Sequence, residues 1–136
     1  MHLPSIMQRT FAVAALLTLA ACHNLPWNNG PKKPAQVTTA NVALGDSLFN
    51  YGTCQRCHGK GGVGATNAPA LDGKKWLQLK TGGYDEIVKL ITDGVAKEAI
   101  KDPAHKFAMR GRGGPANYTD AQVQALAAYV WTLSHK

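Results

Sequence analysis

Apolar side chains recur every three or four positions in three parts of the chain, which is the spacing of one helix face. The first part is 41–52, where Val42, Gly45, Phe49 and Gly52 follow this spacing. Glycine inside a helix costs about 1 kcal/mol relative to alanine. We therefore expect a helix over 41–52 in which Gly45 faces a closely packed second backbone.

The second part predicts a helix over 84–94. Acidic residues open the segment, as is typical of a helix N-terminus, and Gly94 stands where a C-terminal cap is expected. The predicted apolar face of this helix consists of Ile87, Leu90 and Ile91.

The third part predicts a C-terminal helix that begins at a capping box, with Thr119 at the N-cap and Gln122 three positions later. The apolar stripe that follows consists of Val123, Leu126, Ala127, Val130 and Leu133. Ala125 and Ala128 are small enough to admit a neighbouring helix, and we expect Gly45 to be their counterpart. The first and last helices are therefore predicted to cross.

Two segments show no regular period. The polar, glycine-rich stretch 59–64 predicts a loop, and it lacks the flanking strand and helix that a phosphate-binding loop requires. The segment 95–117 predicts a long loop or a set of short turns. Loops of this length in small domains are usually functional, and this one contains His105 and Met109.

Residues 1–21 read as a targeting segment and are set apart from the fold. Arg9 supplies a positive charge, and the apolar stretch 10–20 is too short to span a bilayer as a helix. It leads through Leu-Ala-Ala into Cys22, which resembles the lipobox of bacterial lipoproteins. We expect a lipid on Cys22 to anchor the chain on the periplasmic side of a bacterial membrane. An ordinary signal peptide that leaves Cys22 as a free thiol is the alternative.

The segment 22–39 has three prolines and no period, so it is predicted to be a flexible tether. The folded domain is predicted to cover 40–136. The whole chain has 136 residues, which suits one domain.

The net charge is +7, from 15 Lys and Arg against 8 Asp and Glu. The basic residues of the domain are scattered among acidic ones, without the basic helix or aromatic-studded strands of a nucleic-acid-binding protein. We therefore expect no nucleic acid. The charge is interpreted as a surface that steers an acidic partner, or simply as a soluble surface.

The strongest chemical signal is Cys54-Gln55-Arg56-Cys57-His58, the C-x-x-C-H pattern of c-type haem attachment. Two thiols three positions apart can each add to one vinyl group of the same porphyrin, and His58 can then coordinate the iron. A zinc site would need four ligands, and there is no second cysteine pair. No βαβ pattern supports a thioredoxin-like redox pair, and a disulfide here would close only a small, tight loop.

Two further members of the site are predicted: a hydrogen-bond partner for His58 and a sixth ligand for the iron. A metal-bound histidine usually donates its second ring N–H to a carbonyl, and Pro69 or a neighbour is the candidate partner of His58. Met109 is the predicted sixth ligand, because it is the only methionine after the leader. His105 and an open coordination position are the alternatives.

The chain resembles the class I cytochrome c family in its short bacterial form, over roughly residues 40–135. The matching stretches are Gly45 to Phe49, Cys54 to Gly59, Pro69 to Leu71, Ile87 to Val95, Met109, and Thr119 to Val130. The resemblance implies an all-α fold, with crossing N- and C-terminal helices, a third helix and long loops around one covalently bound haem c. In the family the methionine is commonly followed by proline, whereas Arg110 follows Met109 here.

What the resemblance implies about function is single-electron transfer by a monomeric carrier, not enzymatic catalysis. The haem would be attached through Cys54 and Cys57, with His58 and Met109 as axial ligands. Two other functions stay open. One is a ligand sensor or peroxidase-like enzyme with a labile sixth ligand, and the other is a fixed electron-entry subunit of a dehydrogenase or oxidase.

Overall fold

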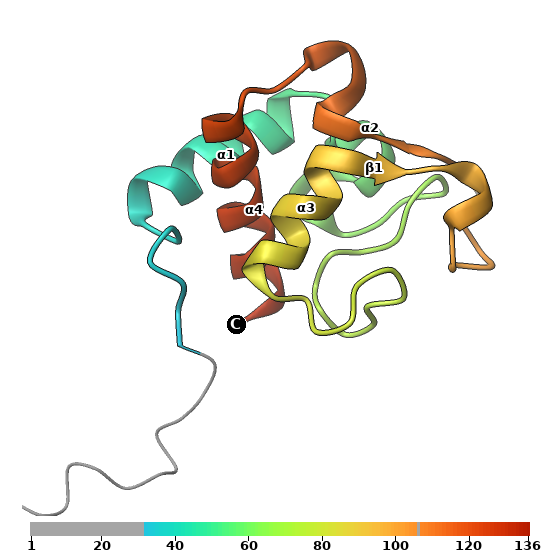
Figure 1. Cartoon of the computed structure of the whole chain (residues 1–136), viewed down its shortest axis with the longest axis horizontal. Coiled ribbons are helices and arrows are strands. Elements are labelled where there is room, and N and C mark those ends of the chain that lie inside the picture. The colour runs from blue at the N-terminus through green and yellow to red at the C-terminus, as the bar shows by residue number, and fades with distance from the viewer. Residues whose placement is uncertain (1–31, 106) are drawn as a thin grey trace, which may run out of the picture. The chain divides into compact units, whose positions relative to one another are not determined.

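The computed structural model describes residues 32–105 and 107–136 (Figure 1). The predicted leader 1–21, Cys22 and the first part of the predicted tether lie outside the described residues. In the part of the chain that the structure describes, no helix is both long and apolar enough to cross a membrane.

The described residues form a mainly helical fold, as the sequence predicts. The α-helices are α1 (Thr39–Tyr51), α2 (Gln55–His58), α3 (Tyr84–Asp93) and α4 (Asp120–Ser134). Short 3₁₀ turns are η3 (Lys60–Gly62), η4 (Lys97–Ala99) and η5 (Gly111–Ala116), and two strands are β1 (Gly94–Val95) and β2 (Met109–Arg110).

The sequence predicts that the folded domain starts at residue 40. In the structure, ordered contacts begin a few residues earlier. Thr38 caps α1 by accepting a hydrogen bond from the Asn41 N–H at 3.1 Å. Val37 is only 2% exposed and belongs to the core, so it is not part of a solvated tether. Val37 lies in a proline-containing segment whose apolar residues follow no period, and its burial could therefore not be read from the sequence.

The ends of α3 and α4 follow the predicted signals. Gly94 ends α3 with a φ of 74°, a backbone conformation that favours glycine. At α4 the capping box is complete, because Thr119 Oγ1 accepts from the Gln122 N–H and the Gln122 side chain accepts from the Thr119 N–H at 3.0 Å. These two predictions are confirmed.

α4 packs against both α1 and α3 (Figure 1). At the crossing with α1, a Cβ atom on Gly45 would overlap the Ala125 carbonyl and would lie 2.8 Å from the Tyr129 Cβ. The predicted close approach of Gly45 to Ala125 is therefore confirmed. Glycine is needed here because the two backbones leave no room for a side chain.

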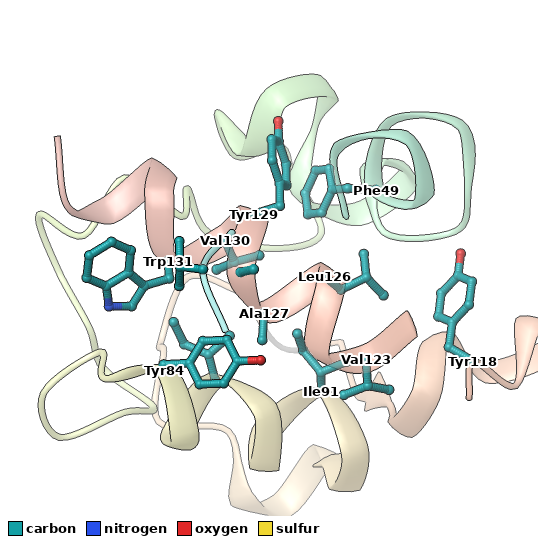
Figure 2. Close-up of a cluster of buried hydrophobic side chains, with 13 residues drawn as sticks. Phe49, Tyr84, Ile91, Tyr118, Val123, Leu126, Ala127, Tyr129, Val130 and Trp131 are labelled. Atoms are coloured by element: carbon teal, nitrogen blue, oxygen red, sulfur yellow. The ribbon is translucent and has the colours of Figure 1, made fainter. Parts of the chain in front are cut away.

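The core surrounds α4. Phe49 lies beside Tyr129 on one side of this helix, with ring centroids 5.4 Å apart, and Tyr84 and Ile91 lie on the other side (Figure 2). The buried cluster consists of Val37, Phe49, Tyr84, Ile87, Ile91, Tyr118, Val123, Leu126, Ala127, Ala128, Tyr129, Val130 and Trp131. The apolar residues of three helices thus meet, as their periods predict.

The sequence did not predict that β1 and β2 pair in an antiparallel manner, with Val95 opposite Met109 and Gly94 opposite Arg110. A side chain on Gly94 would overlap the Met109 carbonyl oxygen. The segment predicted as a loop therefore returns to the end of α3, and this return places Met109.

Candidate functional site

The motif Cys54 to His58 forms one helical turn, which only Gly52 and Thr53 separate from the end of α1. The Cys57 and His58 N–H groups both donate to the Cys54 carbonyl, at 3.2 and 3.0 Å. Cys54 is half-buried, and burial raises the pKa of its thiol, whereas Cys57 is exposed. Both cysteines are free, so the motif does not form a disulfide in this structure. One turn therefore presents two thiols and an imidazole together.

These three side chains line a cavity of about 340 Å³ that also receives Met109. Most of the remaining wall is apolar and comes from all three long helices and from the loop after His58. The apolar residues are Phe49, Ala68, Leu71, Trp76, Leu79, Ile87, Leu90, Ile91, Phe107, Ala108, Pro115, Leu126 and Val130. A second cavity, of about 110 Å³, shares His58, Trp76 and Met109 with the first.

The His58 ring is oriented by the Pro69 carbonyl, because Nδ1 lies 3.0 Å from that oxygen. A carbonyl only accepts, so Nδ1 carries the proton and donates, which leaves the Nε2 lone pair free. Burial lowers the pKa of the imidazole, and the bond to Pro69 acts in the opposite direction. The neutral ring that burial favours is the form that binds metals.

The loop between His58 and Pro69 is held by its own backbone. Gly59 has a φ of 74°, and the Gly64 N–H donates to the His58 carbonyl at 2.7 Å. The Leu71 N–H donates to the Gly62 carbonyl at 2.8 Å. The prediction of a glycine-rich loop is therefore correct, and its turns bring the Pro69 carbonyl back to the ring from which the loop started.

Met109 is held at the cavity by β2. It pairs with Val95, and a side chain on the next glycine, Gly111, would overlap the Thr92 carbonyl oxygen. The backbone on both sides of Met109 therefore lies directly on the end of α3. Arg110 stands where the family commonly has proline, and pairing between the strands supplies constraint at this position instead.

Two other histidines, His105 and His135, belong to the described residues and lie elsewhere. His105 lines only the smaller cavity, and its Nδ1 lies 2.7 Å from Asp102 Oδ2. His135 stacks on Trp131 at the end of α4, with ring centroids 4.2 Å apart. Neither lines the larger cavity, whereas Met109 lines both.

Two arginines near the site have different roles. Arg110 is exposed and lines the larger cavity. Arg112 instead donates to the Tyr118 carbonyl at 2.9 Å and to Asp120 at 2.6 Å, so its charge is already paired. Arg112 is therefore part of the scaffold after β2, a role that spacing in the sequence did not reveal.

The donor set fits a covalently held haem. Two free thiols, one imidazole with an open Nε2 and one thioether line a single cavity whose walls are mainly apolar. A macrocycle needs such walls, and its iron needs an axial donor on each face. Within residues 32–105 and 107–136, no group of three or more His, Cys, Asp or Glu side chains is placed to bind a bare metal ion.

Sequence reasoning missed several residues of the cavity, including Thr53, Asn67 and Phe107. Each of the three stands within two positions of a predicted site residue, and this proximity was the available signal. Trp76 lines both cavities.

Comparison with known proteins is consistent with this site. A family model described as cytochrome C oxidase, cbb3-type, subunit III, matches residues 40–130. A search of curated proteins finds no match.

Two solved structures resemble the fold. Cytochrome cL from the marine methylotrophic bacterium Methylophaga aminisulfidivorans MPT superposes with a TM-score of 0.52 at 20% identity, over 70% of this chain and 54% of that one. Cytochrome cL from Hyphomicrobium denitrificans gives a TM-score of 0.50 at 16% identity, over 73% of this chain and 52% of that one. This chain thus spans about half the length of each, and the likeness concerns the fold alone.

Proposed function

The chain belongs to the family described as cytochrome C oxidase, cbb3-type, subunit III, and on this premise we propose that His58 and Met109 are the axial ligands of its haem iron. It is a class I monohaem c-type cytochrome, and members of this family are typically electron carriers rather than enzymes. In this proposal Cys54 and Cys57 hold one haem c through thioether bonds. The bound haem supplies a one-electron couple between ferrous and ferric iron.

The observation that carries the proposal is that His58 and Met109 line the same cavity as both thiols. His58 donates from Nδ1 to Pro69, so its Nε2 is the nitrogen available to a metal. The thioether of Met109 comes from a separate part of the chain and is held against α3. His105 is paired with Asp102 and lines only the smaller cavity, which favours Met109 as the sixth ligand.

The other residues of the cavity support electron transfer in two ways. Buried apolar side chains such as Ile87 and Leu126 exclude water, and this limits the rearrangement that accompanies a change of charge. Thioether ligation by Met109 raises the reduction potential relative to ligation by two histidines. We therefore infer a carrier that exchanges single electrons without breaking substrate bonds.

The experiment compares absorption spectra of the ferric protein and two variants. Thioether ligation gives a weak red charge-transfer band, and Met109→Leu should abolish it while keeping the apolar volume. His105→Ala is the matched control and should retain the band. If the band is absent from the wild-type protein with haem still attached, or persists in Met109→Leu, the assignment of Met109 is wrong.

The same proteins test the sensor or peroxidase-like alternative. A labile sixth position would let carbon monoxide bind the reduced wild-type protein at neutral pH. We expect no such binding to the wild-type protein and clear binding to Met109→Leu, because the ligand must first displace a thioether in the former. Ready binding to both would favour the alternative.

We also propose that an acidic redox protein is the partner. Gln78 hydrogen-bonds to the Ala99 carbonyl and the Lys101 N–H, which joins the loop 74–80 to the turn 97–101. The exposed lysines of these two segments are Lys74, Lys75, Lys80, Lys97 and Lys101. Because Lys75 also lines the smaller cavity, this basic surface lies beside the proposed haem.

Charge steering weakens with added salt, so the rate of electron exchange with an acidic partner should fall as ionic strength rises. We propose that the protein works as a freely exchanging monomer. A complex that persists at high salt would instead indicate a fixed subunit of a dehydrogenase or oxidase.

We further propose that a lipid on Cys22 anchors the protein to the periplasmic side of a bacterial membrane, with the residues between Cys22 and Val37 in the connection to the haem domain. The support is the sequence around Cys22 alone. Membrane fractionation of wild-type protein and Cys22→Ser tests this, because only the wild-type protein should remain with the membrane. Equal release of both would exclude lipid anchoring at Cys22.

A further inference from the structure

The segment 111–117, here called the strap, connects β2 to Tyr118, which stands just before the N-cap residue of α4. Arg112, Gly113 and Gly114 within it have consecutive positive φ values of 53°, 69° and 61°. Such a run is costly for the non-glycine residue, so surrounding contacts must hold it in place. Because the strap follows Met109 and Arg110 directly, its position affects that of Met109.

Two sets of contacts attach the strap to the helices. Arg112 donates to the Tyr118 carbonyl at 2.9 Å and pairs with Asp120. Tyr118 in turn donates from its hydroxyl to the Leu48 carbonyl in α1 at 3.3 Å. These contacts fix Arg112, the second residue of the strap, to the start of α4, and Tyr118, the residue after the strap, to α1.

A third contact joins the strap to the haem-attachment segment. Thr53 Oγ1 donates to the Gly113 carbonyl at 3.1 Å, and the two residues are 60 positions apart in the sequence. Thr53 directly precedes Cys54, and both Thr53 and Gly113 line the larger cavity. A Cβ atom on Gly113 would lie 2.9 Å from Thr53 Oγ1 and 2.5 Å from the nearest atom of the Tyr118 ring, so the strap fits closely at this point.

We propose that Thr53 is a positioning residue that holds the strap, and through it Met109, closed over the cavity. This inference rests on the proposed ligation by Met109. It adds that the Thr53 hydroxyl keeps Met109 in the position for ligation. The Thr53 hydroxyl is the side-chain donor that links the segment of the two thiols to the segment that follows the thioether. Its loss frees the strap at the cavity while the contacts of Arg112 and Tyr118 remain.

The expected effect is a more frequent opening of the Met109 segment. A neutral hydrogen bond contributes a net amount that corresponds to about a fivefold change in an equilibrium constant. A competing ligand binds only the open form, so its apparent affinity rises with the open fraction. Thr53→Val keeps the shape of the side chain and removes the donor, and Thr53→Ser keeps the donor.

The experiment titrates imidazole into ferric haem-loaded protein and follows loss of the red charge-transfer band. Thr53→Val should bind imidazole about fivefold more tightly than the wild-type protein, and Thr53→Ser should behave like the wild-type protein. Thr53→Ala provides a second variant without the hydroxyl. Tyr84→Phe is the matched control, because Tyr84 donates to the Gln124 carbonyl at the same 3.1 Å but does not line the cavity.

The outcomes separate this inference from the proposed function. Absence of the band from the wild-type protein overturns the Met109 assignment and this inference with it. Presence of the band, with equal imidazole affinity in the wild-type, Thr53→Val and Thr53→Ala proteins, overturns the role of Thr53 alone. A rise in affinity in Tyr84→Phe as large as that in Thr53→Val also overturns it, because general loosening of the fold would then explain both.

Discussion

Replacement of Gly45 by alanine sets two effects of opposite sign against each other. In an isolated helix the change should stabilise, because alanine is a better helix former by about 1 kcal/mol. In this protein a Cβ on Gly45 would overlap the Ala125 carbonyl and lie 2.8 Å from the Tyr129 Cβ. Neither atom is the end of a flexible side chain, so the two helices must move apart to admit the methyl group.

The structure indicates that the steric effect is the larger one. Extra volume in a closely packed core costs about 1–3 kcal/mol, and the contact here is with backbone, which places it at the upper end. Separation of α1 from α4 also exposes apolar surface, at about 1 kcal/mol for each 40 Å². After the gain in helix propensity is subtracted, Gly45→Ala should lower the free energy of unfolding by about 2 kcal/mol.

Urea unfolding of the reduced haem-loaded protein, followed by far-ultraviolet circular dichroism, measures this change. Ala43→Gly is the control, because Ala43 lies exposed on the same helix and should lose about 1 kcal/mol from propensity alone. The reasoning is refuted if Gly45→Ala is as stable as the wild-type protein or more so. Propensity would then outweigh packing, and the crossing would be looser than the structure indicates.

Three further changes have defined outcomes. Val37→Ala removes buried apolar surface ahead of α1 and should lower the free energy of unfolding in urea by about 2 kcal/mol. An unchanged midpoint would show that Val37 does not contribute to the core. Asn50→Ala removes the acceptor of the Gly61 N–H and the donor to Asp46 and Tyr129 and should cost about 1–2 kcal/mol in urea unfolding, whereas an unchanged midpoint would contradict this. Hydrogen bonds from Thr81, the backbone N–H first, hold the pKa of Glu86 below its usual value, so this carboxylate stabilises the fold above about pH 4.3 and the effect is lost as pH falls through the lowered pKa. Stability of Glu86→Gln should therefore be lower than that of the wild-type protein near pH 7 and approach it in acid; a constant difference between the two proteins would contradict this.

The long helices could be predicted because their signals are local. Thr119 and Gln122 stand within one turn of each other, and Gly94 ends a clear apolar period. α2 and the two strands were not predicted, because they are too short to give a local signal. Four residues do not complete a period, and two paired residues do not alternate.

The candidate site shows the same division. Cys54, Cys57 and His58 are adjacent in sequence, so their shared chemistry is visible without a structure. Interpretation of Met109 as a ligand relied on the scarcity of other donors, and that assignment stays a prediction. The bond between Thr53 and Gly113 had no signal at all, because it depends on how β2 and η5 return the chain across 60 positions.

The crossing of α1 and α4 also has a consequence for the order in which the domain folds. Asn50 and Tyr129 meet across 79 positions, so this closure joins the two ends of the folded unit. Contacts so distant in sequence form slowly, because the entropy of closing a large loop is lost before the contacts stabilise the chain. In the turn that carries Cys54 and Cys57, the backbone N–H groups of residues 56–58 donate to the Thr53 and Cys54 carbonyls, so the turn itself needs no such closure. Leu126 and Val130 complete the cavity only when α4 arrives, so the thiols are accessible in a nascent chain well before the wall around them exists.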